Sequence, residues 1–142
     1  MDQSDIFGPF LALMWLTLAV WIYMYVRRIA LIRRERIDPR RLALPGELAR
    51  LSPAAVSNPS DNLRNLFELP VLFYALALLL YVTDRVDGTY VVVAWAFVAF
   101  RFAHSIVHCT FNRVMVRFYC YLAASLALWI MVLRASYDYL LR

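Results

Sequence analysis

Residues 6–26 read IFGPFLALMWLTLAVWIYMYV, a run of 21 residues without a charged side chain. A helix needs about 20 apolar residues to cross the hydrocarbon core of a bilayer. Tyr23 and Tyr25 lie near the end of the run, and Arg27 and Arg28 follow it, an order that is typical of a membrane–water interface. The run therefore predicts a transmembrane helix near the start of the chain.

Three further apolar segments follow this helix. Prolines between residues 37 and 61 break any longer helix, so this segment is expected to be a polar loop with one short turn at Glu47–Leu51. Only Asn112 and Arg113 separate the last two apolar segments, which should be antiparallel neighbours. The predicted helices span about residues 6–36, 61–82, 89–111 and 114–133, and an amphipathic tail covers residues 134–142.

The composition favours a membrane protein for the whole chain. Hydrophobic residues make up 63% of the 142 residues, more than a soluble domain of this length can bury. The length fits one domain, and the first apolar run lacks the basic start and small-residue cleavage site of a signal peptide. We therefore expect residues 1–142 to form a single all-α domain, an integral membrane four-helix bundle.

The basic residues are unevenly distributed. All fifteen are arginine, and nine of them lie between Arg27 and Arg64. Because arginine-rich loops stay on the cytoplasmic side, the first and third loops are expected there, with both termini on the non-cytoplasmic side. The basic segment lacks interleaved aromatic residues for stacking on bases, so it indicates contact with anionic membrane lipids rather than nucleic acid. Arginine without lysine, together with short loops, favours a bacterial inner membrane.

Several polar side chains lie inside the predicted spans. A charged side chain at mid-bilayer costs about 2.5–3.5 kcal/mol on insertion scales, so these groups should face the interior of the bundle. At about 100° per residue they form one stripe on each of the last three helices. The stripes lie toward the cytoplasmic ends and are expected to form one shared polar pocket. They comprise Asp61, Asn65 and Glu68, then Arg101, His104, His108 and Asn112, then Arg117, Tyr121 and Ser125.

Structural roles for these residues are the main alternative to a binding site. Glu68 and Arg101 are also compatible with a buried ion pair that holds the bundle together. His104 and His108 have the i, i+4 spacing of metal ligands, but no third ligand stands out, so no metal is expected. Two histidines on one helix are also unsuited to ligate a haem from both faces. Several arginines with an amide and a tyrosine suit an anionic, peptide-like ligand.

Three motifs, taken in order, resemble the MAPEG family, the membrane-associated proteins of eicosanoid and glutathione metabolism. They are RNLFELP at residues 64–70, RFAH at residues 101–104 and the later Arg117, and the resemblance extends over nearly the whole chain. It implies a homotrimer of four-helix subunits with glutathione bound at each subunit interface near the cytoplasmic side. Family members conjugate or isomerise lipophilic electrophiles, or reduce lipid hydroperoxides. Glutathione as co-substrate, a lipophilic small-molecule substrate and membrane lipids are therefore the expected partners.

The resemblance also implies roles for individual side chains. Arg117 matches the family arginine that faces the glutathione sulfur, and it is the expected catalytic residue. An arginine at the end of the first helix contributes in the family. Arg33, Arg34 and Arg36 are the candidates here, and Arg34 is taken into the predicted site. The expected glutathione-binding set is Arg34, Arg64, Asn65, Glu68, Arg101, His104, His108 and Tyr121.

Three positions depart from the family pattern. The family often has arginine where this chain has Asp61, and Arg64 is expected to take over its contact with a glutathione carboxylate. His108 stands where tyrosine is common. Phe118 stands where the prostaglandin E synthase-like branch has serine, which argues against the isomerase chemistry of that branch.

These residues support two hypotheses for function. The first is a glutathione-dependent transferase or peroxidase that acts on a lipophilic electrophile or lipid hydroperoxide, with the thiolate stabilised by Arg117. The alternative, motivated by Asp61 and Phe118, is a non-enzymatic MAPEG-like membrane protein that binds a lipid or partner through the same pocket. A small transporter is a weaker third, because no inverted repeat is visible.

Overall fold

The computed structural model describes residues 2–43 and 46–140, which are helical apart from turns and short connections. Four helical segments are long and apolar enough to cross a membrane, at residues 3–34, 54–82, 88–109 and 114–140. They confirm the all-α class and the four predicted membrane spans. The elements are η1 (Gln3–Ile6), α1 (Phe7–Arg34), η2 (Pro39–Ala43), α2 (Glu47–Leu51), α3 (Ala54–Leu66), α4 (Leu69–Val82), α5 (Gly88–Cys109) and α6 (Val114–Leu140).

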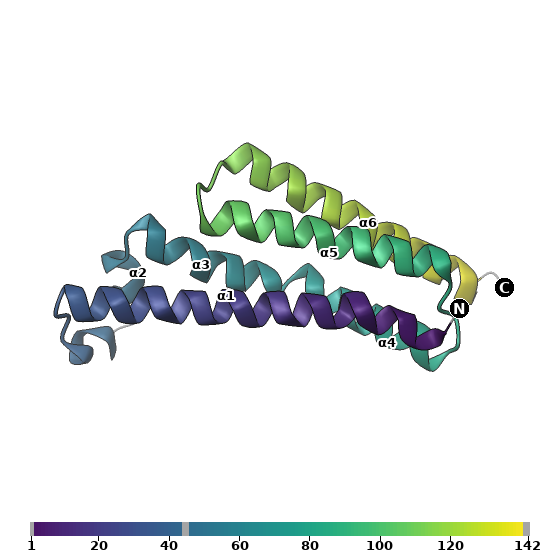
Figure 1. Cartoon of the computed structure of the whole chain (residues 1–142), viewed down its shortest axis with the longest axis horizontal. Coiled ribbons are helices and arrows are strands. Elements are labelled where there is room, and N and C mark those ends of the chain that lie inside the picture. The colour runs from purple at the N-terminus through teal and green to yellow at the C-terminus, as the bar shows by residue number, and fades with distance from the viewer. Residues whose placement is uncertain (1, 44–45, 141–142) are drawn as a thin grey trace.

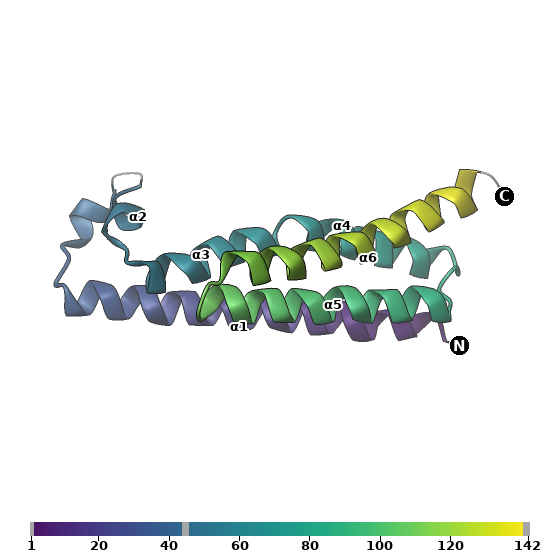
Figure 2. The ribbon, with the colours of Figure 1, turned by 90° about the horizontal axis from the view of Figure 1, so that it is seen from above.

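The long helices lie side by side along the long axis of the molecule (Figures 1 and 2). α5 and α6 are joined by a short turn and pack against each other, while α1 packs on α3 and α5. α3 and α4 follow one another in the same direction and together make the second span. Both chain ends lie at one end of the bundle, and α2 lies at the other.

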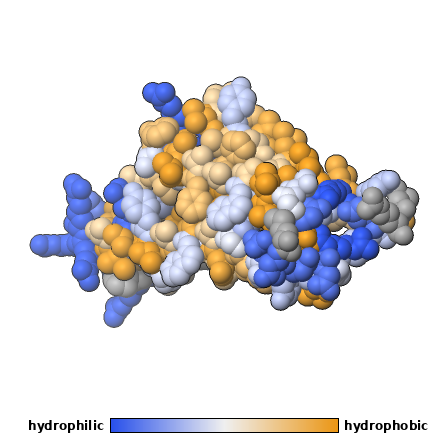
Figure 3. All heavy atoms as spheres, turned by 45° about the vertical axis from the view of Figure 1, so that its right-hand side comes forward, coloured by the Kyte–Doolittle hydropathy of each residue, from blue (hydrophilic) through white to orange (hydrophobic). Residues whose placement is uncertain are grey.

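The outer surface of the bundle is apolar between two polar ends. Trp15, Val82 and Leu133 are 67%, 75% and 69% exposed, which would be unfavourable in water. On the face seen in Figure 3, hydrophobic residues cover the middle and hydrophilic residues gather toward the two ends. Apart from the polar residues described below, the interior is also apolar, and the ring centroids of Phe73 and Phe97 lie 4.9 Å apart there. An apolar middle of four spanning helices is the surface of an integral membrane protein.

α3 begins at Ala54, so the predicted loop over residues 37–61 is wrong for its last part. Pro59 lies inside this helix, where it removes one amide donor from the hydrogen-bond ladder. The carbonyl group that loses its partner belongs to Ala55, which is exposed and can be solvated. The helix therefore tolerates a proline that was expected to exclude it. The expected turn at Glu47–Leu51 is present as α2.

The second span is interrupted at Phe67 and Glu68, between α3 and α4. Pro70 is the second residue of α4 and cannot donate an amide to the carbonyl oxygen of Leu66. Glu68 has φ −99° and ψ −104°, far from helical values. The span consequently changes course at the depth of the predicted polar pocket.

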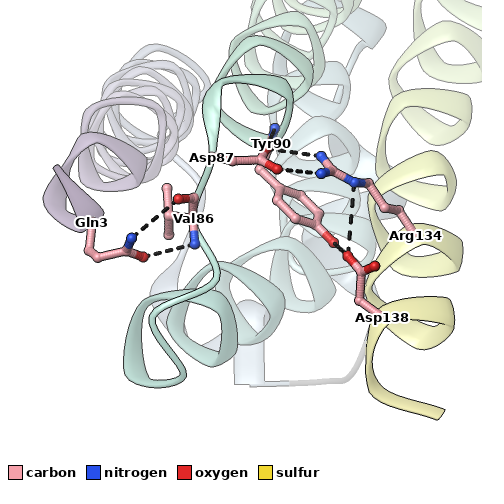
Figure 4. A network of polar contacts seen from close by, with 6 residues as sticks. All are labelled: Gln3, Val86, Asp87, Tyr90, Arg134 and Asp138. Carbon is pink, nitrogen blue, oxygen red and sulfur yellow. Dashed lines mark hydrogen bonds and ion pairs between the residues drawn. The ribbon is translucent and has the colours of Figure 1, made fainter. Parts of the chain in front are cut away.

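α6 continues to Leu140, so residues 134–140 of the expected tail belong to the last helix; residues 141 and 142 lie outside the described residues. Arg134 donates to both carboxylate oxygens of Asp87 and lies 4.0 Å from Asp138 (Figure 4). Asp87 also caps α5 by accepting the amide of Tyr90 at 3.0 Å, a favourable N-cap contact. These contacts fasten the last turns of α6 to the start of α5, near the two termini.

Candidate functional site

The polar stripe of α5 is buried inside the bundle. Arg101, His104 and His108 are 0%, 2% and 3% exposed. They occur every three or four residues along α5 and so lie on one face of it. α3 and α6 supply the polar groups that contact this face. Burial of an arginine without a carboxylate partner is costly, so its surroundings decide what the site can do.

Arg101 binds the end of α3 through the main chain. Its Nη2 donates a hydrogen bond to the carbonyl oxygen of Asn65 at 2.5 Å. Its guanidinium carbon lies 5.5 Å from the centroid of the Tyr121 ring, within the range of a cation–π contact. Nε and Nη1 of Arg101 are buried and have no partner in the described ranges. Two strong donors therefore remain to be satisfied.

Glu68 does not form the buried ion pair considered from the sequence. Glu68 is exposed. Within residues 2–43 and 46–140, it forms no ion pair of 4.0 Å or less. It still lies within electrostatic reach of Arg101 and of the Tyr121 hydroxyl. The carboxylate thus faces the edge of the polar cluster and is open to a ligand or another chain.

The two histidines contact each other and α6. Nδ1 of His104 lies 3.0 Å from the main-chain oxygen of Arg117. Because a carbonyl oxygen only accepts, Nδ1 carries the proton in this contact. The rings of His104 and His108 are perpendicular, with centroids 5.4 Å apart. Nε2 of His104 and Nδ1 of His108 are buried without a partner among the residues described. They add two unsatisfied nitrogen atoms to those of Arg101.

Arg117 is half-buried at the start of α6. Its Nη1 donates to Oδ1 of Asn112 at 2.8 Å, and Nδ2 of Asn112 donates to Oδ1 of Asn58 at 3.1 Å. Asn112 has a φ of +43° in the α5–α6 turn, a conformation that asparagine tolerates better than most residues. This chain of contacts ties the turn to α3 and holds the Arg117 guanidinium beside the α5 stripe.

Asn58 and Asn62 also belong to the polar cluster. Asn58 was predicted to lie in a loop, and Asn62 lies in the predicted second helix but was not among the expected site residues. Asn62 is fully buried. It accepts from the Ser105 hydroxyl at 3.4 Å and donates to the Cys109 sulfur at 3.5 Å. Asn58, Asn62 and Asn65 follow i, i+4, i+7 spacing, which places them on one face of α3. That spacing was the signal that the assumed loop concealed.

The arginines near the first loop lie in different environments. The Arg34 side chain is 86% exposed and lies 3.7 Å from Glu35. Arg28 instead reaches α3, where its Nη2 donates to the Ser60 hydroxyl at 2.8 Å. Arg64 is exposed and lies 3.7 Å from Asp61. Among the described residues of the chain, neither Arg34 nor Arg64 joins the buried cluster of α5.

The structure thus brings six of the predicted site residues together and leaves others apart. In the parts of the chain that are described, no three His, Cys, Asp or Glu side chains form a group that could hold a metal ion. Donors outnumber acceptors in the cluster, which suits an anionic or carbonyl-rich ligand. The clustered residues are Asn65, Arg101, His104, His108, Arg117 and Tyr121.

The fold and this cluster define a polytopic membrane protein with a buried, donor-rich polar site. Comparison with family models matches the MAPEG family over residues 6–137. The chain belongs to this family, so the resemblance seen in the sequence is confirmed. The family includes glutathione transferases and peroxidases. Comparisons with curated proteins and with solved structures found no significant match.

Proposed function

We propose that this protein is a glutathione-dependent transferase or peroxidase that acts on a lipophilic electrophile or lipid hydroperoxide. The observation that carries the proposal is the set of four buried nitrogen atoms of Arg101, His104 and His108 that lack a partner in the described chain. An unpaired buried donor or acceptor costs about 1–3 kcal/mol. Glutathione offers two carboxylates and two amide carbonyl groups to the Arg101 donors, and its amide N–H and ammonium groups can donate to Nε2 of His104, which accepts because Nδ1 carries the proton.

The other members of the cluster suit the remaining groups of the tripeptide. The Glu68 carboxylate can accept hydrogen bonds from the glutathione ammonium, and the Asn65 side chain can pair with a peptide group. Arg64 is the candidate for a terminal carboxylate. An exposed carboxylate and an exposed arginine at the edge of a cluster also suit a site completed by a neighbouring subunit, which agrees with the homotrimer that we propose.

Arg117 would act on the glutathione sulfur. A guanidinium beside the thiol lowers the thiol pKa, because it stabilises the thiolate relative to the neutral group. In the transferase reaction, the thiolate attacks an electrophilic carbon and the leaving group departs with its bonding electrons. In the peroxidase reaction, the thiolate attacks a hydroperoxide oxygen, the O–O bond breaks, and the alkoxide takes a proton. A second glutathione then converts the sulfenic acid to disulfide and water.

We also propose a bacterial inner-membrane location with the arginine-rich first loop in the cytoplasm. Glutathione would then reach the site from the aqueous side, while the lipophilic substrate enters from the bilayer. In this orientation both chain ends lie on the non-cytoplasmic side. Reporter fusions at the two ends of the chain test this orientation. Activity at either end of a reporter that works only in the cytoplasm contradicts it.

Turnover by the purified protein tests the proposed activity. Reconstituted protein is assayed with glutathione and either a chlorodinitrobenzene-type electrophile or a lipid hydroperoxide. We expect turnover above the protein-free rate, and a fall of about a hundredfold in kcat/KM for Arg117→Ala, the scale of one lost electrostatic contact in a transition state. Arg113→Ala, an exposed arginine of the same turn, is the matched control. Turnover at background, with Arg117→Ala unchanged, contradicts the proposal.

A non-enzymatic role as a binding protein is the second candidate. Arg64 is paired with Asp61, and Arg117 with Asn112, so both arginines already have partners that compete with glutathione. A protein of this kind would keep the polar cluster for a lipid or a protein partner. Calorimetric titration with glutathione separates the two candidates, because millimolar or tighter binding is expected only of the enzyme.

A further inference from the structure

Two adjoining cavities lie beside α1 and α3, outside the buried cluster of α5. One, of about 230 Å³, is closed by the α2 region and lined by both apolar and polar residues; the polar ones are Arg28, Ser52, Ser57, Ser60, Asp61 and Arg64. The other, of about 390 Å³, shares Arg28, Ser60 and Arg64 but is otherwise apolar and aromatic. The shared residues make one amphipathic groove, which we call the α1–α3 groove. A groove that is polar at one end and apolar at the other matches a phospholipid, which has a polar headgroup and apolar acyl chains.

The polar end of the α1–α3 groove lies at the depth of lipid headgroups. α1 rises about 1.5 Å per residue, so Arg28 lies about 32 Å from Phe7 along the helix. The hydrocarbon core is about 30 Å thick, and α1 is apolar from its first residues to Val26. Trp21 and Tyr25, which line the apolar cavity, are residue types that concentrate at membrane interfaces. Arg28 therefore lies where a phosphate would be.

The hydrogen bonds of the groove leave donors for a phosphate. One N–H of Arg28 donates to Ser60 at 2.8 Å, and the planar guanidinium has four more N–H groups. Ser60 accepts this bond with its oxygen, so its own hydroxyl can donate to the same ligand. A guanidinium beside a hydroxyl is a common arrangement for binding phosphate oxygens.

The charge of the groove selects one kind of headgroup. Asp61 lies 3.7 Å from Arg64 and offsets its charge within the groove, so the net charge of Arg28, Arg64 and Asp61 together matches a single negative charge. A phosphodiester carries that charge, whereas a phosphate monoester carries more. The segment from residue 27 to residue 64, which contributes most of the groove, carries nine arginines and four acidic residues. This positive field favours an anionic lipid over one whose headgroup also carries a cationic choline.

We propose that the α1–α3 groove binds one anionic phospholipid of the surrounding leaflet, such as phosphatidylglycerol. Arg28 and Ser60 hold its phosphodiester, and one acyl chain lies along Trp21, Leu63 and Phe67. This lipid site is separate from the proposed glutathione site and does not require catalytic activity. Arg64 is the one residue that borders both, which the experiment takes into account.

Lipid retention tests the proposal on the full-length protein. The protein is reconstituted in equal amounts of phosphatidylcholine and phosphatidylglycerol, extracted in mild detergent, and examined by native mass spectrometry. We expect phosphatidylglycerol to be retained preferentially, with one lipid per chain. Arg28→Gln should lower this retention about tenfold, the scale of one charge-assisted hydrogen bond, and Ser60→Ala about fivefold.

Arg40→Gln is the matched control, because Arg40 is an exposed arginine of the same basic segment that does not line the groove. It removes the same charge and should change retention less than about twofold. Equal losses in Arg28→Gln and Arg40→Gln overturn the proposal in favour of general surface attraction. Equal retention of the two lipids also overturns it.

Two competitors identify the occupant. Inorganic phosphate and millimolar glutathione are added in turn before detergent extraction, and the retained lipid is expected to stay bound. Displacement by phosphate indicates an anion site, and displacement by glutathione assigns the groove to the proposed glutathione site; either result overturns the lipid site. Thermal unfolding checks each variant. If Arg28→Gln fails to fold, the test rests on Ser60→Ala. Retention of phosphatidylglycerol by Ser60→Ala that equals that of the parent protein then overturns the proposal.

Discussion

Arg101 donates a hydrogen bond from Nη2 to the main-chain carbonyl oxygen of Asn65 at 2.5 Å. In an unbroken helix this carbonyl would accept the amide of Leu69, but the break at Phe67 and Glu68 leaves it free. The arginine therefore occupies an acceptor exposed by the interruption of the second span. Its remaining donors are left to a ligand.

Arg101→Met is expected to separate stability from binding. Methionine removes a buried charge that has no carboxylate partner, which is favourable, but leaves the Asn65 carbonyl oxygen unpaired, which is unfavourable. Because these effects oppose each other, the midpoint of thermal unfolding should change by only a few degrees. Glutathione binding, measured by calorimetric titration, should weaken at least about tenfold, because one charged contact is lost. Arg113→Met serves as the exposed control. Unchanged binding in Arg101→Met would remove this residue from the proposed site.

The two prolines of the second span allow a matched comparison. Pro70→Ala restores an amide for the carbonyl oxygen of Leu66, which favours a continuous helix and displaces Glu68. We expect a several-fold loss of glutathione affinity with little loss of helix by circular dichroism. Pro59→Ala also restores an amide but lies inside a helix that is already continuous, so it should bind glutathione normally. Equal affinities in the two variants would show that the break does not position the ligand.

The pH dependence of turnover should report on Arg117. Loss of the guanidinium raises the pKa of the bound glutathione thiol, because the thiolate loses its nearest positive charge. The rising limb of the kcat–pH profile should therefore move to higher pH in Arg117→Leu and much less in Arg117→Lys. Thiolate absorbance in the ultraviolet, measured at neutral pH on glutathione binding, should fall in Arg117→Leu. A profile that keeps its position while only the rate falls would assign Arg117 a different role.

The membrane spans could be predicted from the sequence because lipid imposes a strong pattern on each of them. A run such as residues 6–26 has few other interpretations. The start of α3 could not be predicted in this way, since a proline such as Pro59 ordinarily argues against the interior of a helix. That error concealed Asn58, which contacts the α5–α6 turn. Asn62 lies within the predicted helix, but its contact with Ser105 of α5 was not predicted. Local sequence rules describe where an amide is lost, whereas tertiary packing decides whether the loss is tolerated.

The polar stripes could be predicted in part. The spacing of Arg101, His104 and His108 was enough to place them on one inward face, because helical periodicity is independent of their partners. The partners themselves were not predictable. A carboxylate was the obvious match for Arg101, but the break in the second span offers it the carbonyl group of Asn65 instead. Contacts that depend on an irregular backbone cannot be predicted from the spacing of residues along a regular helix.

The contact between Asp87 and Arg134 should make stability depend on pH. The hydrogen bond from Arg134 holds the pKa of the Asp87 carboxyl below its ordinary value. A carboxyl whose pKa is lower in the folded state stabilises the fold at pH values above its unfolded pKa. That stabilisation is lost as the pH falls through the folded value, so the loss should begin near pH 4 and continue below it.

Asp87→Asn isolates this charge, because asparagine keeps a side-chain oxygen that can cap α5. The two side chains are 45% and 34% exposed, so solvent screening limits the ion pair to at most about 1 kcal/mol. Thermal unfolding of Asp87→Asn and Arg134→Met should therefore show a small loss at neutral pH and a flatter decline below pH 4 than the parent protein. Asp84→Asn removes an exposed carboxylate from the same turn and should retain the parent's profile. If all three variants decline as steeply as the parent, acid sensitivity arises at other carboxylates and the Asp87–Arg134 contact contributes nothing to it.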